Sequence, residues 1–221
     1  GQITVKNVSG TDATHIPLRL YRMLQVSKIL DPSGHPVNFS QQILSHEDWP
    51  VLQTNYIDIA LKTPIKPSEN YTFSIQFSGS LRGYSETGMS YIKDRISEDF
   101  SIIRMDAFAY PMVLYPNDSV NRKAKFWLHL YDYAVSVTVP RNYVVANGGE
   151  LKGKTVDQAT TTYQYANKLP VWRMDFAIAP YQVYQKDNYR IFSWESETDS
   201  NALLKRIEKT FALYKEWFGP L

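Results

Sequence analysis

The sequence has no cysteine among its 221 residues and contains only 4 histidines. The absence of cysteine excludes disulfide bridges, zinc–thiolate sites and a cysteine nucleophile. The formal net charge is only +2 and no basic run stands out, so no nucleic-acid partner is expected. No apolar run approaches the roughly 18 residues that a membrane-spanning helix needs. We therefore expect a soluble polypeptide without a membrane span, and these absences leave its compartment open.

The histidines and serines that are present do not complete a catalytic motif. The segment HEDWP, at His46, begins like the zinc motif H-E-x-x-H, but Pro50 stands where the second histidine belongs. Ser85, in GYSETG, misses the nucleophile pattern G-x-S-x-G by one residue. We therefore predict no catalytic residue, no metal site and no cofactor in this chain, and a complete small hydrolase is the least favoured interpretation.

Aromatic residues are abundant, with 16 Tyr, 10 Phe and 5 Trp, and such residues suit the half-buried surface of strands. In NYTFSIQFSG, which begins at Asn70, apolar and polar side chains alternate strictly, and this predicts a strand with one buried face. TNYIDIALK shows the same two-residue period. KFWLHLYDYAVSVTVP also shows it, but its apolar face changes parity around Asp132, which predicts a bulge or bend.

The segment WRMDFAIAP completes this pattern, and Trp172 is expected to face inward together with Met174, Phe176 and Ile178. Short strands at fairly even spacing predict a mainly β fold over residues 1–195. We expect an antiparallel β-sandwich or saddle of many short strands. Residues 82–101 are polar and lack a clear period, so they are expected to form a long loop or a partly ordered excursion, and long loops inside compact domains are often functional.

The C-terminal segment DSNALLKRIEKTFALYKEWF changes to a period of three and four residues, which predicts one amphipathic α-helix. Asp199 or Ser200 is expected to cap its start, and Gly219 followed by Pro220 is expected to end it. The apolar stripe is wider than one sheet edge needs, so part of it should stay exposed here and contact a second domain. The stripe residues expected at that domain interface are Phe211, Tyr214, Trp217 and Phe218.

Several segments follow one another in a specific order, namely RMDAFAYPMV, VSVTVPRNYVVANGGEL, PVWRMDFAIAPYQVY and a helix ending in YKEWFGPL. In this order they resemble the N-terminal domain of the aminopeptidase N family of zinc metallopeptidases, which includes leukotriene hydrolase. The resemblance extends over nearly the whole chain. The matching positions are Asp106-Ala107 with Tyr110-Pro111, Val139-Pro140 with Tyr143, Ala146-Asn147-Gly148, Asp175-Phe176-Ala177 and Phe218-Gly219.

The resemblance implies that this chain is a non-catalytic N-terminal domain. The catalytic segments of the family, G-x-M-E-N and H-E-x-x-H with a further glutamate, come later in its chains and do not occur in this sequence. Zinc is therefore expected in a catalytic domain that this sequence lacks. Residues 1–195 would cover the active site and limit peptide entry, and residues 196–221 would begin the catalytic domain.

The resemblance also implies the partners. They would be the parent protein's own catalytic domain and its peptide substrate. The parent would be a zinc-dependent (amino)peptidase or a pseudo-enzyme derived from one. Its compartment stays open: this chain would lie on the cytoplasmic or the extracytoplasmic side of the membrane, and a bacterial parent anchored in the membrane is one of the alternatives.

In the family, a Gln or Glu just before the D-A-R stretch lines the pocket for the substrate's amino end. The matching position here falls near Ser101, and Phe108 stands where the family has arginine, so this pocket would differ from the family's. The polar residues that the resemblance brings nearest to the substrate are Glu98, Asp99, Ser101, Arg104 and Asp106.

A free-standing β-sandwich that binds a carbohydrate or another protein is the alternative interpretation. Tyrosine and tryptophan side chains can serve as sugar-stacking platforms or as interface anchors.

Overall fold

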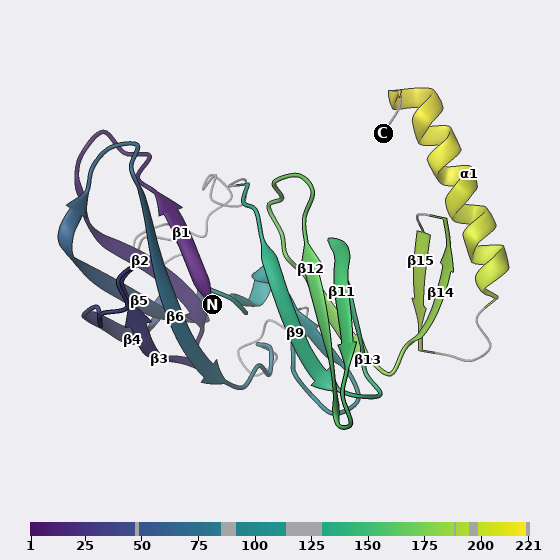
Figure 1. Cartoon of the computed structure of the whole chain (residues 1–221), viewed down its shortest axis with the longest axis horizontal. Helices are drawn as coiled ribbons and strands as arrows, with labels where there is room; N and C mark the ends of the chain where they lie inside the picture. The colour runs from purple at the N-terminus through teal and green to yellow at the C-terminus, as the bar shows by residue number, and fades with distance from the viewer. Residues whose placement is uncertain (47–48, 85–91, 114–129, 188, 195–198, 220–221) are drawn as a thin grey trace.

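The residues that the structure describes form two β-sandwiches, a β-hairpin and one α-helix (Figure 1). The structure, a computed structural model, describes residues 1–46, 49–84, 92–113, 130–187, 189–194 and 199–219. In these ranges every strand pair is antiparallel. The described sheets stay open, and this confirms the mainly β fold with a C-terminal helix.

The first sandwich packs a sheet ordered β4-β5-β2-β8 on a sheet ordered β1-β6-β3. Its strands are β1 (Gln2–Lys6), β2 (Ala13–Tyr21), β3 (Leu24–Leu30), β4 (Phe39–His46), β5 (Trp49–Ile65), β6 (Asn70–Gly79) and β8 (Met112–Val113). The predicted alternation is confirmed, because Ile57 and Ile59 are fully buried and Phe73 and Ile75 are 1% exposed. These side chains meet in one core between the two sheets.

The segment 82–101 was predicted to be a long loop or a partly ordered excursion, and its described residues make specific contacts. Tyr84 is fully buried, and its hydroxyl donates to the Gln53 carbonyl at 2.6 Å. Arg95 forms an antiparallel bridge with Ile102. Ser85 and the rest of residues 85–91 lie outside the described residues.

The second sandwich consists of a sheet ordered β10-β13-β7 and a sheet ordered β11-β12-β9. Its strands are β7 (Ser101–Ile103), β9 (Ala134–Pro140), β10 (Val144–Asn147), β11 (Glu150–Val156), β12 (Thr160–Ala166) and β13 (Phe176–Ala179). The two sheets enclose a smaller core that includes Val139, Val145, Tyr163 and Phe176.

The strand predicted across Asp132 is interrupted there. Tyr131 forms only an isolated bridge with Val171, and β9 begins at Ala134. The change of parity in the sequence therefore coincides with a break between two pairings. Residues 125–129 of that prediction, including His129, lie outside the described residues.

The inward orientation predicted for Trp172 is wrong. β13 begins only at Phe176, and Trp172 is 45% exposed. Phe176 and Ile178, which do belong to the strand, are buried as predicted. Residues 172–175 are outside any strand, so the two-residue alternation does not control their side chains.

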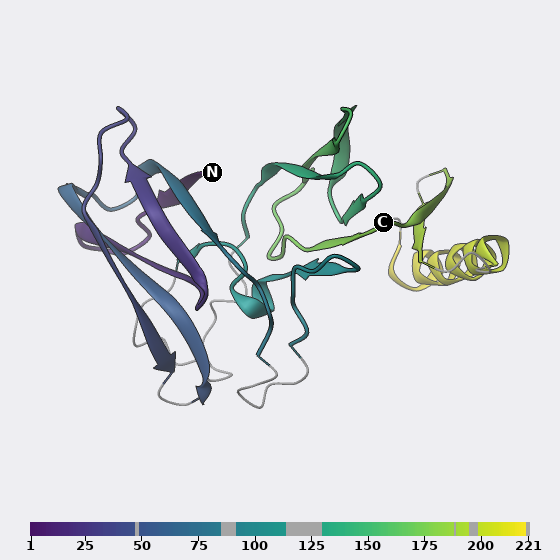
Figure 2. The same ribbon diagram turned by 90° about the horizontal axis from the view of Figure 1, so that it is seen from below.

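The hairpin, β14 (Gln182–Lys186) and β15 (Tyr189–Ser193), carries the helix α1 (Ser200–Phe218). Asp199 caps α1 by accepting from the Ala202 amide at 2.9 Å, and Gly219 ends it with φ 84°, as predicted. The first sandwich, the second sandwich and α1 follow one another along the molecule (Figure 2). None of the described helices is long and apolar enough to cross a membrane.

Candidate functional site

Five charged side chains form a row of alternating ion pairs, which we call the charge ladder: Asp94, Arg104, Asp106, Arg173 and Asp175. Arg104 donates to both carboxylate oxygens of Asp94, from Nε at 3.1 Å and from Nη2 at 2.7 Å. Asp106 Oδ2 lies 3.8 Å from Arg104 Nε and accepts from Arg173 Nη2 at 2.5 Å. Arg173 Nε donates to Asp175 Oδ2 at 2.7 Å. The ladder thus contains two of the predicted substrate-facing residues, Arg104 and Asp106.

Asp94 is the fully buried end of the ladder. A buried carboxylate needs a paired charge and hydrogen bonds to offset its loss of hydration, and Arg104 supplies both. The hydrogen bond to Asp94 also raises the pKa of Arg104. Gly83 lets the backbone that carries Asp94 approach closely, because a Cβ added at Gly83 would lie 2.7 Å from the Ile92 carbonyl oxygen and 3.2 Å from that of Asp94, and Gly83 has a φ of +71°.

Asp175, at the other end of the ladder, is partly buried near two tyrosines. Its Oδ1 atom is buried and has no hydrogen-bond partner among the described residues, and burial raises the pKa of this carboxyl. The hydroxyls of Tyr110 and Tyr131 lie 3.2 Å apart, and the Met174 amide donates to the Tyr110 oxygen at 3.2 Å. Burial raises the pKa of both tyrosines, so both keep their hydroxyl protons at neutral pH.

The chemistry of the ladder is that of fixed charge pairs. Each of its three carboxylates is held by a guanidinium group. Among the described residues, no group of three or more His, Asp or Glu side chains is placed to hold a metal ion. The described residues therefore do not fit a zinc site, and the ladder is suited to positioning parts of the chain.

Three other predicted substrate-facing residues lie in a separate turn. Asp99 Oδ1 accepts from the Ser97 hydroxyl at 2.6 Å and from the Phe100 amide at 2.9 Å. The bond from Ser97 lowers the pKa of Asp99, whose side chain is 62% exposed. Glu98 is exposed too, and its backbone carbonyl accepts from the Tyr143 hydroxyl.

Ser101 is 6% exposed, and its hydroxyl is bonded within the same turn. Its Oγ donates to the Ser97 carbonyl at 3.4 Å and accepts from the Ser97 amide at 3.2 Å. Both hydrogen bonds use backbone groups of one residue. The hydroxyl therefore fixes the turn that leads into β7.

Phe108, which occupies the position of the family's arginine, lies in the core of the first sandwich at 1% exposure. It follows the 3₁₀ turn η2 (Met105–Ala107) and has a positive φ of 54°. Its amide donates to the Met105 carbonyl, and its own carbonyl accepts from the Tyr21 amide at 2.7 Å. At this position the side chain serves packing.

The sequence analysis did not identify Asp94 and Arg173 as site residues. Asp106 and Arg173 are 67 positions apart, so no local pattern connects them. Asp175 and Tyr110 were named as motif positions, and this was the only signal that pointed to the second half of the ladder.

The aromatic end of α1 is a second candidate surface. The predicted interface residues are exposed: Phe211 by 41%, Tyr214 by 44%, Trp217 by 62% and Phe218 by 75%. The rings of Tyr214, Trp217 and Phe218 contact one another with centroids 6.0–6.4 Å apart. Only Phe211 reaches the hairpin through a described ring contact, with its centroid 5.4 Å from that of Tyr189.

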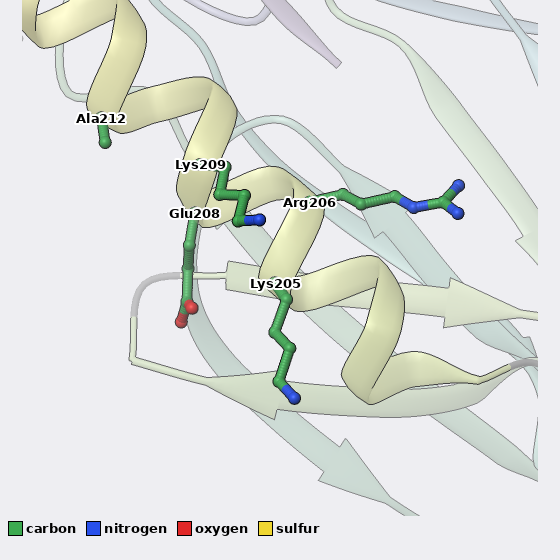
Figure 3. Close-up of a pocket in the computed structure, with 5 residues that line it drawn as sticks. All are labelled: Lys205, Arg206, Glu208, Lys209 and Ala212. Atoms are coloured by element: carbon green, nitrogen blue, oxygen red, sulfur yellow. The ribbon is translucent and has the colours of Figure 1, made fainter.

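The polar side of α1 has a shallow depression lined by Lys205, Arg206, Glu208, Lys209 and Ala212 (Figure 3). Glu208 is paired with Lys186 of the hairpin at 2.6 Å. The side chains of Lys205 and Arg206 point in different directions, so they do not converge on one ligand.

No family model matches the sequence, and no curated protein matches it either. Solved structures of similar fold include M1 zinc metallopeptidases. A mutant of such an enzyme from Deinococcus radiodurans, bound to a Tyr-Ser-Ala substrate, gives a TM-score of 0.62 at 18% identity. Another structure of the enzyme from this organism gives 0.60 at 17%. A two-domain M1 zinc metallopeptidase mutant bound to L-arginine gives 0.65 at 17%.

Each of these comparisons covers 100% of this chain and 49% of the other chain. The chain therefore spans about half the length of the metallopeptidases that it resembles. It has the fold of that half of an M1 zinc metallopeptidase.

Proposed function

We propose that this chain is the non-catalytic N-terminal part of a zinc metallopeptidase-like parent, in which it covers the active site and shapes the access of peptide substrates. The observation that carries the proposal is the fold likeness, which extends over 100% of this chain and 49% of an M1 enzyme. The ordered motifs that end in Phe218-Gly219 support the same assignment.

The partner in this proposal is the parent's own catalytic domain, which would also hold the zinc ion. The exposed rings of Phe211, Tyr214, Trp217 and Phe218 support this partner. Contiguous exposed aromatic side chains are typical of surfaces that another domain covers. Residues 196–221 then form the connection to that domain.

The substrate-facing residues are part of the same proposal. Asp99 and Glu98 are the best supported of the five, because their side chains are open to solvent. Arg104 and Asp106 are paired within the ladder, so they would act by holding this wall of the active site in shape. Ser101 would act through the turn that it fixes.

A free-standing binding module for carbohydrate or protein is the second candidate function. One observation favours it: Trp194 is 51% exposed and stacks on Phe100 with a centroid distance of 5.5 Å. An exposed, rigidly stacked indole ring is a suitable platform for a sugar ring.

The test compares residues 1–221 with a longer polypeptide that continues into the proposed catalytic domain. Both are assayed on aminoacyl-arylamide substrates, with and without a metal chelator. We expect chelator-sensitive turnover from the longer polypeptide and none from residues 1–221. Turnover by residues 1–221 alone would overturn the proposal, and specific binding on a glycan array would favour the second candidate.

A further inference from the structure

The two sandwiches have separate hydrophobic cores that come together at a narrow junction. The core of the first sandwich includes Ala107 and Phe108, whereas the second is built around Val145 and Phe176. Among the described residues, Ile103 is the one hydrophobic side chain that packs against both cores. The apolar part of the junction is therefore small.

The described side-chain contacts across this junction are largely polar. Asp106 belongs to η2, and the next two residues, Ala107 and Phe108, lie in the first core. The Asp106 carboxylate accepts a hydrogen bond from Arg173 at 2.5 Å. Arg173 lies three residues before Phe176, the first residue of β13 in the second sandwich.

The chain crosses the junction at Arg104, between β7 and η2, and also between Ile92, which lies in the first core, and Arg95, which bridges to Ile102 of β7. A further connection joins β8 of the first sandwich to β9 of the second.

Tyr110 makes the second polar connection. Its ring packs against the first core. Its hydroxyl accepts from the Met174 amide at 3.2 Å and lies 3.2 Å from the Tyr131 hydroxyl. Both of these partners belong to segments that run into the second sandwich.

Two packed units joined by a small and polar contact move relative to each other unless specific bonds hold them. We propose that the Asp106–Arg173 ion pair, supported by the Tyr110 hydroxyl, is a latch that fixes the angle between the two sandwiches. Opening the latch releases a hinge at Arg104 without unfolding either core. The latch does not depend on the proposed function, because it concerns only contacts within this chain.

The charge ladder gives the latch its strength. Asp106 lies between two guanidinium groups, those of Arg104 and Arg173, and Arg173 is held in place by Asp175. Asp94 in turn holds Arg104. A latch side chain therefore needs little reorientation to form its bond, which lowers the entropic cost of an ion pair.

The absence of native cysteine makes the angle measurable by site-specific spin labels. Cysteines are introduced at Gln42, on β4, and at Thr155, on β11, which are both exposed. The distribution of label distances is then measured by double electron–electron resonance. The unmodified junction should give one narrow distribution.

Asp106→Asn and Arg173→Gln should each broaden this distribution by about twofold, because relative movement is the default for a small interface. Tyr110→Phe should broaden it less. The matched control is Arg95→Gln, which removes a pair with Asp99 at 3.2 Å that lies within a single loop. The control should leave the width unchanged.

The latch is overturned if Asp106→Asn and Arg173→Gln keep the narrow distribution, or if Arg95→Gln broadens it equally. A salt titration of the labelled chain with its native junction decides the matter if a variant fails to fold. Raising the NaCl concentration to about 1 M should broaden the distribution, because the Debye length then falls to about 3 Å and the Asp106–Arg173 pair is partly exposed. An unchanged width at high salt would refute the latch.

Discussion

Replacing Phe108 by glycine and by alanine separates two properties of this residue, its buried ring and its unusual backbone. Phe108 is 1% exposed and has a φ of 54°. A positive φ places Cβ against the backbone and costs about 1–2 kcal/mol for a residue that has a Cβ. Glycine does not have this cost.

Both substitutions remove the ring, and deleting a buried Phe side chain costs about 3–5 kcal/mol in free energy of unfolding. Glycine recovers about 1–2 kcal/mol of backbone strain, and it loses about 0.5–1 kcal/mol because its unfolded chain is more flexible. We therefore expect Phe108→Gly to be more stable than Phe108→Ala by about 0.5–1 kcal/mol.

The assay is urea unfolding followed by circular dichroism, together with hydrogen exchange of the Tyr21 amide, which donates to the Phe108 carbonyl. The control is the same Gly and Ala pair at Gln25, an exposed position within β3, where alanine should be the more stable. An alanine variant at Phe108 that is as stable as the glycine variant would refute the reasoning. So would a loss of less than about 1 kcal/mol in either variant.

Three further predictions concern the site and the helix. Burial raises the folded-state pKa of Asp175 above its ordinary value of 3.8. The protonated Asp175 carboxyl therefore contributes stability below pH 3.8, and this contribution is lost as the pH rises through the raised pKa. Asp175→Asn should therefore gain stability relative to the native chain as the pH rises above about 4 in thermal unfolding, and a pH-independent difference would contradict this. Trp217→Ala should change the free energy of unfolding of residues 1–221 by less than about 0.5 kcal/mol. In a polypeptide that includes the proposed partner domain, the same substitution should cost about 2 kcal/mol. Equal losses in both polypeptides would count against an interface at Trp217. Asp199→Ala should cost about 1 kcal/mol of helix stability, seen as faster hydrogen exchange of the Ala202 amide.

The assignments that could be made from the sequence, those of β5, β6, β9, β13 and α1, rest on local signals. The alternation in β5 and β6 reports burial directly, since neighbouring side chains of a strand point to opposite faces. The cap at Asp199 and the end at Gly219 follow from backbone groups within one turn. Trp172 was assigned wrongly because alternation continues in the sequence before the strand begins.

The charge ladder was only half predicted, because its pairs connect distant segments. Nothing near Arg104 indicates that its partner is Asp94, since charged residues are frequent in polar loops. Phe108 shows that the position of a residue in a motif does not determine where its side chain lies. The resemblance placed it where the family has arginine, whereas its side chain lies in the core of the first sandwich.

The way in which α1 is attached has a mechanical consequence. The helix has 19 residues and is therefore about 28 Å long. It meets the hairpin near its middle, through Phe211 and Glu208, while its aromatic end projects further. It therefore acts as a lever arm on the two strands: a tilt of about 10° at the hairpin displaces the backbone at the far end by about 2 Å, given a rise of about 1.5 Å per residue. In the proposed assembly, a domain bound to Trp217 would therefore transmit force to β14 and β15 through one rigid helix.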